Sequence, residues 1–242
     1  MAGRIVAVTT ELAAPPAIAI VAARNEAGRI GDTLRALAAA LPSAELIVAD
    51  DASDDATAEV ARAHGATVVS RERSVGKGGN MTAAVASVVD RAREPDAPLF
   101  LLCDGDLGAS AAELTPLLEA VRAGECDLAI AAFRRRVGGG FGVALRYAAW
   151  AIERLCGYRA GAPISGQRAL SPVAMRACFP FAPGYGMEIG ITVDVVRAGL
   201  GVRELELDLE HRATGKSLGG FVHRGRQLRD FTRVYRVKRR RG

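Results

Sequence analysis

Two aspartates follow a short apolar run near the middle of the chain. Residues 99–103 are all apolar, and Asp104 and Asp106 come directly after them with one glycine between. An unbroken apolar run of this length predicts a strand buried on both faces of a parallel sheet, and open α/β sheets bind ligands at the carboxyl ends of such strands. Carboxylates this close repel each other unless a cation neutralises them. Oxygen ligands of this kind suit Mg²⁺ or Mn²⁺ bridging to phosphate. An acidic turn that merely caps the next helix is the alternative, since it would have the same sequence pattern.

Two further polar segments lie between predicted strands and helices. Asp50 and Asp51 end the predicted strand 45–49, where a carboxylate can accept hydrogen bonds from a nucleobase or a ribose or can simply cap a helix. Lys77 is flanked by glycines before a predicted helix, which suits contact with a phosphate through backbone N–H groups and one charge. The spacing of a P-loop is absent, and a solvated turn is the alternative.

The second half of the chain holds two more candidate groups. His211, Arg212 and Lys216 bring an imidazole, a guanidinium and an ammonium into one glycine-containing loop, which favours contact with a metal or a phosphate. Glu188 opens the predicted helix 187–198. It is either an acid favoured by the helix dipole or a general base that faces an acceptor.

The elements that must position these residues alternate regularly in the first half of the chain. Predicted strands cover 17–23, 45–49, 66–70 and 99–103, with predicted helices at 30–41, 56–64 and 81–92. In the second half we expect helices at 114–123 and 141–155, strands at 127–132 and 202–209, and a mobile loop at 134–140. This order predicts a single α/β domain with a doubly wound, mostly parallel sheet flanked by helices.

Size and composition agree with one globular domain. The chain has 242 residues, of which 50% are hydrophobic and 24% charged. No apolar run reaches the roughly 18 residues that span a bilayer, and residues 1–16 lack the features of a signal peptide, so we expect a cytoplasmic protein. The four cysteines are scattered without CxxC spacing, which argues against a zinc site or a disulfide framework.

The net charge of +5 is concentrated near the end of the chain, where Asp230 is the sole acid after His211. We expect residues 218–242 to form a basic tail, with apolar side chains such as Phe231 and Val234 between the arginines. This pattern favours peripheral attachment to an anionic membrane. Nucleic acid is not expected as a partner because aromatic residues are only 5% of the chain. The segment 141–155 is either a packing helix or an amphipathic helix that rests on a membrane.

In their order, these segments resemble family 2 glycosyltransferases with the GT-A fold, particularly polyprenyl- or dolichyl-phosphate sugar synthases. The resemblance covers residues 17–217. The matching segments are Ala22-Ala23-Arg24-Asn25-Glu26, Val48-Ala49-Asp50-Asp51-Ala52-Ser53-Asp54-Asp55, Lys77, the DxD motif Asp104-Gly105-Asp106, Ser165-Gly166-Gln167-Arg168-Ala169-Leu170 and His211-Arg212-Ala213-Thr214-Gly215-Lys216-Ser217.

The resemblance also implies roles for individual residues. Asp104 would hold the ribose or assist the metal, Asp106 would bind Mg²⁺ or Mn²⁺ at the diphosphate, and His211 is a candidate further ligand. Lys77 would compensate charge on the diphosphate, and Glu188 would be a catalytic base if the acceptor is an alcohol. The nucleotide pocket would be lined by Ala23, Asn25, Glu26 and Asp51, and the anionic acceptor or diphosphate would be held by Gly166, Gln167, Arg168, Arg212 and Lys216.

The expected function is metal-dependent transfer of a hexose from a nucleotide sugar to a phosphorylated acceptor, either a polyprenyl phosphate or a small metabolite. Residues 17–108 would form the nucleotide-sugar half and 109–217 the acceptor half, after an N-terminal extension at 1–16. Two alternatives remain. One is a nucleotidyltransferase, although 22–28 lack the glycine-rich basic loop of that class; the other is a basic membrane- or nucleic-acid-binding protein on the same scaffold.

Overall fold

The computed structural model describes residues 16–133, 142–209 and 218–240, with the side chains of 218–226 left out. Its centre is a seven-stranded sheet in the order β3-β2-β1-β4-β6-β5-β7. All neighbouring strands are parallel except β6, which runs antiparallel to β4 and β5. The strands are β1 (Ala17–Ala23), β2 (Glu45–Asp50), β3 (Thr67–Ser70), β4 (Leu99–Asp104), β5 (Leu128–Phe133), β6 (Arg168–Leu170) and β7 (Val202–Leu207). The predicted doubly wound, mostly parallel sheet is confirmed.

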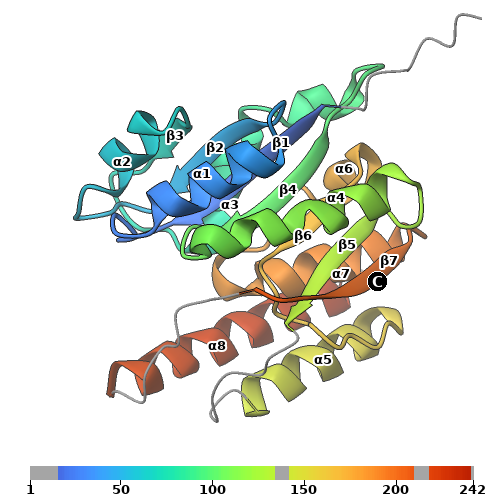
Figure 1. The fold of residues 1–242 in the computed structure, drawn as a ribbon. Coiled ribbons are helices and arrows are strands. Elements are labelled where there is room, and N and C mark those ends of the chain that lie inside the picture. Colours follow the sequence, from blue (N-terminus) through green and yellow to red (C-terminus); the bar gives the residue numbers. More distant parts are fainter. Residues whose placement is uncertain (1–15, 134–141, 210–217, 241–242) are drawn as a thin grey trace, which may run out of the picture.

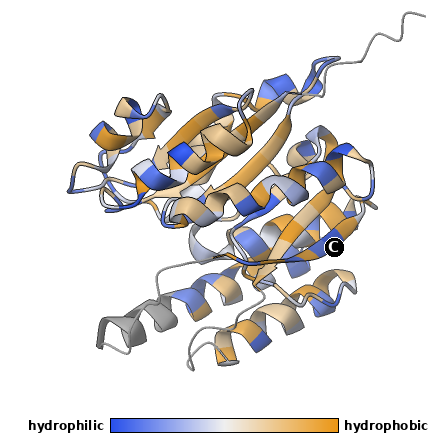
Figure 2. Ribbon diagram, in the orientation of Figure 1, coloured by the Kyte–Doolittle hydropathy of each residue, from blue (hydrophilic) through white to orange (hydrophobic). Residues whose placement is uncertain are grey.

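Helices cover both faces of this sheet (Figure 1). The α-helices are α1 (Ile30–Ala40), α2 (Thr57–Ala63), α3 (Lys77–Ala86), α4 (Thr115–Arg122), α5 (Gly142–Cys156), α6 (Pro172–Cys178), α7 (Met187–Arg197) and α8 (Leu218–Arg240), with 3-10 turns η1 (Val89–Arg93), η2 (Gly108–Leu114) and η3 (Gly184–Gly186). Helices α1, α2 and α4 pack on one face, and α3, α6 and α7 on the other. Strand side chains alternate between these two cores, so that Ala19 and Val21 face the first and Ile18 and Ile20 the second. Figure 2 shows that the central strands are hydrophobic, whereas the helices that cover them carry both hydrophobic and hydrophilic residues.

Several boundaries differ from those predicted from the sequence. Helix α3 begins at Lys77 rather than at residue 81, because the glycines 78 and 79 lie within its first turn instead of in a loop. Strand β4 extends through Asp104. The sequence pattern did not predict β6 and α6. Three residues of β6 are too few to show periodicity, and its antiparallel pairing depends on the neighbours β4 and β5.

A third layer of helices lies outside α7. Helices α5 and α8 lie side by side below the rest of the molecule in Figure 1 and enclose a small core with α7. Phe231 and Val234 of α8 are only 1% and 3% exposed within it, so the prediction that these side chains face a membrane is wrong. The helix is also held by Lys238, which pairs with Asp194 of α7. Residues 218–240 of the predicted basic tail therefore form a helix, and Phe231 and Val234 of that helix belong to the folded core.

Among the helices of the described residues, none combines the length and the apolar character that crossing a membrane requires.

Candidate active site

The carboxyl ends of β1, β2 and β4 meet at one edge of the sheet and bring the predicted donor residues together. In the strand register Asp104 of β4 lies beside Ala22 of β1, and Asp50 of β2 lies beside Ala23. Because the three strands are parallel, their following loops also emerge side by side. The motifs that are far apart in the sequence therefore share this edge.

The loops after β1 and β2 are joined by hydrogen bonds. The backbone N–H of Asn25 donates to Ser53 Oγ over 2.9 Å, and the N–H of Asp54 donates to Asn25 Oδ1 over 2.8 Å. The N–H of Glu26 donates to Thr57 Oγ1 over 2.8 Å. Asn25 has φ of 56°, a left-handed conformation that asparagine adopts more readily than most residues. These contacts fix the backbone of the predicted nucleotide pocket, in which Ala23 is buried and Asn25 is exposed.

The two adjacent aspartates at the end of β2 bind different loops. Asp50 accepts hydrogen bonds from the hydroxyl and the backbone N–H of Ser53. Asp51 turns to the segment before α3 and accepts from Ser74 Oγ, at 2.6 Å, and from the N–H of Val75 and Gly76, at 2.8 and 3.1 Å. Both side chains are buried. The pair therefore organises two neighbouring loops of the site.

A charged cluster forms where β4, α3 and α7 meet. Lys77 Nζ lies 2.6 Å from Asp104 Oδ1 and 3.1 Å from Glu188 Oε1. Gln167 Nε2 donates to the other oxygen of Asp104 over 2.8 Å. Gly166 lies against these groups, since a Cβ there would be 2.3 Å from Lys77 Nζ and 2.7 Å from Asp104 Oδ2. Lys77 and Asp104, which were predicted to bind the nucleotide sugar, therefore lie against Glu188, the predicted base, and against the Gly166-Gln167 segment.

The carboxylates of this cluster keep Lys77 positively charged. Burial acts to lower the pKa of Lys77, but the negative charges of Asp104 and Glu188 outweigh it and hold the pKa well above its ordinary value. The ammonium is therefore charged at neutral pH, and it faces two carboxylates, with Asp106 close by in sequence. By contrast, burial raises the pKa of the Cys103 thiol, which makes this residue a core side chain and not a nucleophile.

The turn that contains the two aspartates is held by α1 and β1. The N–H of Gly105 donates to the carbonyl of Ala22 over 2.8 Å, and Thr33 Oγ1 donates to the carbonyl of Gly105 over 2.9 Å. Arg29 Nη1 donates to the carbonyl of Asp106 over 3.0 Å. The sequence did not indicate Thr33 and Arg29, because both side chains bind backbone carbonyls and such contacts require no particular residue type at the partner position.

The residues of this turn fit a hard divalent cation. Within the described ranges no group of three or more His, Cys, Asp or Glu side chains gathers to hold a metal. Asp104 and Asp106 together supply carboxylate oxygens, and Mg²⁺ is typically bound by one or two carboxylates that leave further positions to water and to substrate phosphates. His211, the third predicted ligand, lies outside the described residues, as do Arg212 and Lys216.

Arg168 is not placed where it could bind the acceptor substrate. Its side chain is fully buried, with Nε donating to the carbonyl of Ser165 over 2.7 Å and Nη1 donating to Thr192 Oγ1 of α7 over 2.9 Å. Burial lowers the pKa of this guanidinium to about 10, although the charge of Glu188 acts to raise it. The prediction that Arg168 binds the acceptor is therefore wrong: alternation along β6 directs this residue into the core next to α7.

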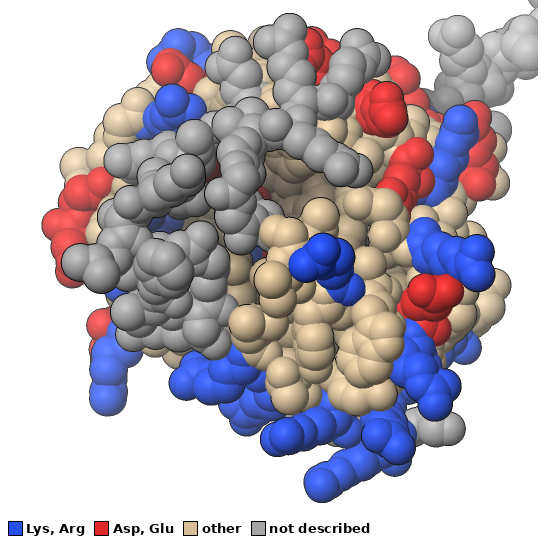
Figure 3. Space-filling view, turned by 90° about the horizontal axis from the view of Figure 1, so that it is seen from below, with Lys and Arg blue, Asp and Glu red and all other residues tan. Residues whose placement is uncertain are grey.

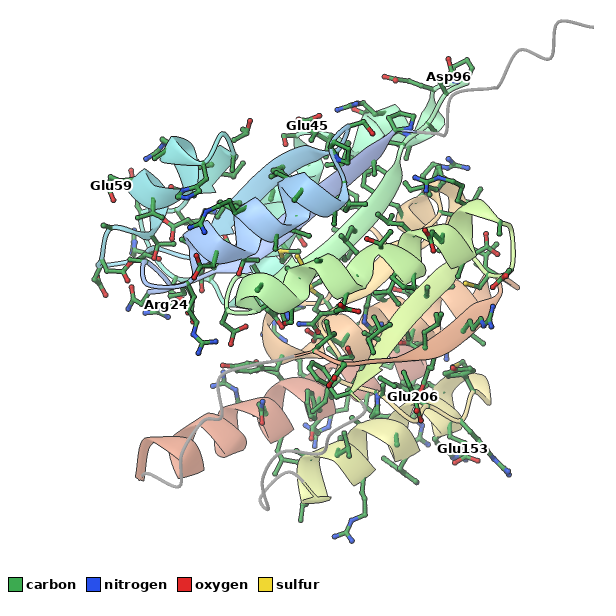
Figure 4. The ribbon with its side chains drawn as sticks, viewed as in Figure 1. Arg24, Glu45, Glu59, Asp96, Glu153 and Glu206 are labelled. Atoms are coloured by element: carbon green, nitrogen blue, oxygen red, sulfur yellow. The ribbon has the colours of Figure 1, made fainter. Side chains whose placement is uncertain are left out.

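Ser74 is a further residue of the site that the sequence pattern did not indicate. Its hydroxyl donates to Asp51 and accepts from Arg24 Nη1, at 2.9 Å, so that it joins the loops after β1 and β2 to the segment before α3. Arg24, labelled in Figure 4, extends from the end of β1 at this edge of the sheet. A single serine in an exposed polar segment does not indicate a functional role in the sequence, because its contact with Asp51 forms only in the folded chain.

The chain matches known proteins in sequence and in structure. Residues 18–181 match the family model described as Glycosyl transferase family 2. Solved structures of glucosyl-3-phosphoglycerate synthase from Mycobacterium tuberculosis are similar over 93% of this chain and 80% of theirs, at 27% identity. One, in complex with Mn²⁺, UDP and glucosyl-3-phosphoglycerate, has a TM-score of 0.74, and another, with phosphoglyceric acid, has a TM-score of 0.75. No curated protein sequence matches the chain at a significant level.

These findings confirm the predicted GT-A fold. The family match covers more than half of the chain and includes the loops after β1, β2 and β4 as well as Gly166 and Gln167. The chain belongs to glycosyl transferase family 2.

Proposed function

We propose that this protein transfers a hexose from a nucleotide diphosphate sugar to a phosphorylated acceptor, with Mg²⁺ or Mn²⁺ as the cofactor. The observation that carries this proposal is the contact of Lys77 with both Asp104 and Glu188 at the carboxyl edge of the sheet. The similar mycobacterial synthases support it, since they have been solved with Mn²⁺, UDP-glucose and phosphoglyceric acid or with Mg²⁺ and UDP.

On the donor side, the nucleoside would lie against the loops that contain Ala23, Asn25 and Glu26. Asp104 and Asp106 would hold the metal, whose chemistry is to neutralise the charge that develops on the departing nucleoside diphosphate. Lys77 would supply a second positive charge to the same phosphates. Its raised pKa supports this role, because the ammonium then needs no change of protonation during turnover.

In the reaction, the bond between the anomeric carbon and the diphosphate oxygen breaks, and its electron pair leaves with the nucleoside diphosphate. An acceptor oxygen forms the new bond to the anomeric carbon. If that oxygen belongs to a hydroxyl group, Glu188 would take its proton; if it belongs to an ionised phosphate monoester, no base is required. We assign Gly166 and Gln167 to the part of the site that contacts the acceptor. His211, Arg212 and Lys216 are assigned to contacts with an anion or a metal.

Direct assay of transfer tests this proposal. The purified protein would be incubated with UDP-glucose and Mn²⁺ and with phosphoglyceric acid, glycerol 3-phosphate or a polyprenyl phosphate in detergent. Non-phosphorylated glyceric acid and glycerol serve as matched controls. We expect a glycosylated product, detected by mass spectrometry, with a phosphorylated acceptor only. Equal transfer to the non-phosphorylated acceptors would contradict the assignment of the acceptor class.

The Glu188→Gln variant separates the two acceptor chemistries in the same assay. For a hydroxyl acceptor the variant should lose about 10²-fold or more in kcat, since general base catalysis contributes roughly that much. For transfer to a phosphate oxygen the rate should stay within a few-fold. A product on the hydroxyl group that forms at the wild-type rate in the variant would exclude Glu188 as the base.

We further propose peripheral association with an anionic membrane on its cytoplasmic side, through the outer face of α5 and α8. Val143 and Trp150 of α5 are 62% and 48% exposed, and the Trp150 ring lies 5.1 Å from that of Tyr235 on α8. A groove of about 430 Å³ follows α8 and is lined by arginines and apolar side chains, among them Arg229, Arg233, Arg236, Arg240, Leu228 and Val237. Figure 3 views the molecule from below, the side of α5 and α8, and shows Lys and Arg side chains beside an uncharged patch.

The charges of these helices support a lipid surface rather than a second copy of the chain. Their acids are Glu153, which pairs with Arg159, and Asp230, whose side chain is only 15% exposed. A two-fold symmetric contact would place this arginine face against itself, whereas anionic headgroups complement it. Indole rings with flanking arginines are typical of membrane interfaces.

Trp150 is the single tryptophan of the chain and reports on this contact directly. Vesicles of phosphatidylglycerol should shift its fluorescence to shorter wavelength, whereas phosphatidylcholine vesicles should not. The Arg233→Glu/Arg236→Glu variant should lose the shift and keep its fold. Unchanged fluorescence of the wild-type protein with anionic vesicles would refute the membrane contact without touching the transferase proposal.

A further inference from the structure

We infer that Arg168 is a positioning residue, which holds the Gly166-Gln167 segment and the first turn of α7 at a fixed distance from each other. This inference rests on the proposed function, in which that segment contacts the acceptor and Glu188 lies in the first turn of α7. The guanidinium acts from within the core, because the side chain of Arg168 is fully buried.

On one side, the guanidinium binds the turn just before Gly166. Its Nε donates to the carbonyl of Ser165 over 2.7 Å, and its Nη2 makes a longer contact of 3.5 Å with the carbonyl of Pro163. The turn is closed by the N–H of Ser165, which donates to the carbonyl of Ala162 over 3.2 Å. Gly166 follows at once, so Arg168 fixes the point at which the chain enters the charged cluster.

On the other side, the same guanidinium binds α7. Its Nη1 donates to Thr192 Oγ1 over 2.9 Å, and that hydroxyl donates to the carbonyl of Glu188 over 3.0 Å. A threonine hydroxyl has one proton and two lone pairs, so it can make both hydrogen bonds at once. Two consecutive hydrogen bonds therefore connect Arg168 to the backbone of Glu188.

The charge of this side chain calls for an explanation beyond packing. A buried guanidinium carries a large desolvation cost, and an apolar side chain of similar volume would fill the same space without it. Burial accordingly acts to lower the pKa of Arg168, whereas the charges of Glu188 and Glu204 act to raise it. The planar group offers five N–H donors in fixed directions. Its specific contribution is therefore a set of directed hydrogen bonds to two separate elements.

The loop before Gly166 has a second anchor at its other end. Glu204 Oε1 of β7 accepts from the N–H of Gly161 over 3.0 Å and from the Tyr158 hydroxyl over 3.2 Å. Because this anchor is independent of the guanidinium, loss of Arg168 should release the end of the loop next to the site and leave the end at β7 in place.

Hydrogen exchange followed by mass spectrometry tests the inference without any ligand. Arg168→Met keeps a long unbranched side chain and removes every N–H donor. In this variant exchange should become faster by about tenfold or more in residues 162–167 and 187–192, while β1 and β2 stay unchanged. An increase spread evenly over the whole chain, or no increase, would overturn the inference.

Arg197→Met is the matched control. Arg197 also binds backbone carbonyls, those of Leu155 and Lys238, but it lies in the last turn of α7, away from the site. Its replacement should leave exchange in 162–167 and 187–192 at the wild-type rate. An increase in these two segments equal to that in Arg168→Met would contradict a specific role of Arg168.

Thr192→Val keeps the test decisive if Arg168→Met does not fold. This change preserves the shape of the side chain and removes only the hydroxyl between the guanidinium and the carbonyl of Glu188. Exchange should then become faster in residues 187–192. Wild-type exchange in that turn would overturn the proposed connection.

Turnover distinguishes positioning from packing. With UDP-glucose, Mn²⁺ and a phosphorylated acceptor, kcat of Arg168→Met should fall by about tenfold or more, because small displacements at a reacting centre are costly. The KM for UDP-glucose should stay within about twofold, since the loops after β1 and β2 are held by their own hydrogen bonds. Arg197→Met should keep the wild-type kcat. An unchanged kcat in Arg168→Met, or a change in the KM for UDP-glucose alone, would overturn the inference. If the wild-type protein transfers no sugar, the proposed function fails, and hydrogen exchange still decides whether Arg168 holds the two segments.

Discussion

At the scale of single residues, the site depends on one lysine placed between two carboxylates. Asp104 comes from β4, Lys77 from α3 and Glu188 from α7, and Gln167 precedes β6. None of these side chains is close to the others in sequence. Their contact therefore requires small residues and fixed backbone at the point where the elements meet, and Gly166 is the clearest case.

Substitution of Gly166 by alanine should slow turnover strongly with little effect on the folded structure. A Cβ at this position would lie 2.3 Å from Lys77 Nζ and 2.7 Å from Asp104 Oδ2, so both groups must move. Because a displacement of about 1 Å can cost roughly 10²-fold in rate, we expect a fall in kcat of about that size. Gly142→Ala, where a Cβ meets nothing within 4 Å, is the control and should retain full activity. Wild-type kcat in Gly166→Ala would contradict this arrangement.

Lys77 should also stabilise the fold, with a defined dependence on pH. Its pKa in the folded state is raised above the ordinary value of 10.5, so the stabilisation is fully present below pH 10.5 and is lost only as pH rises through the higher folded-state value. Lys77→Met should therefore lower the free energy of unfolding by roughly 1–3 kcal/mol, the range for a charged hydrogen bond.

Urea denaturation at several pH values checks this, and the difference between wild type and variant should be constant from pH 7 to 9. Arg35→Met, which removes an exposed pair with Asp32, should change the free energy of unfolding by less than about 0.5 kcal/mol. A difference that already declines between pH 7 and 9 would mean that Lys77 loses its proton in that range, contrary to the effect of the two carboxylates.

At the scale of elements, α8 is the least expected part of the fold. Its sequence is dominated by arginine, yet Phe231 and Val234 are buried against α5 and α7, and Asp230 accepts a hydrogen bond from the N–H of Tyr185 just before α7 begins. Through these contacts α8 supports the start of α7, where Glu188 lies. The basic helix therefore contributes to the geometry of the site.

Removal of the buried Phe231 ring in α8 should destabilise the packing of α8 against α5 and α7. Phe231→Ala should lower the free energy of unfolding by about 3–5 kcal/mol, as for large-to-small changes in a core. Val237→Ala on the same helix, where the side chain is 41% exposed, should change it by less than about 0.5 kcal/mol. Urea unfolding measures both. If the two variants had equal stability, α8 would not belong to the folded core.

The strands and their following motifs could be predicted from the sequence because each carries a local signal. Residues 99–103 are continuously apolar, and Asp104 and Asp106 lie where a parallel strand must end. What could not be predicted depends on contacts between distant segments. The burial of Arg168 follows from the antiparallel insertion of β6, and the partners of Asp51 follow from the path of the segment before α3. A motif gives the type of a residue but not the direction of its side chain.

At the scale of the whole molecule, the cluster joins the two proposed halves of the domain. Lys77 and Asp104 belong to the nucleotide-sugar half, residues 17–108, and Gln167 and Glu188 belong to the acceptor half, residues 109–217. A ligand that occupies this junction contacts both halves, so binding of the donor should stabilise the protein as a unit. The outer layer of α5 and α8 lies on the acceptor half and presents the surface proposed for lipid.

In the proposed function, a divalent cation and a nucleotide bind together at the edge where Asp104 and Asp106 lie. The most direct measurement is the thermal unfolding of the wild-type protein and of Asp106→Ala with UDP, in Mn²⁺ and in EDTA. We predict a rise in Tm for the wild type with UDP and Mn²⁺ together, no rise with either alone, and no rise for Asp106→Ala. Ligand at about 100 times its Kd would stabilise the protein by about 2.7 kcal/mol, which is readily measured. An equal rise in EDTA, or one that persists in Asp106→Ala, would show that the nucleotide binds without a metal held by Asp106.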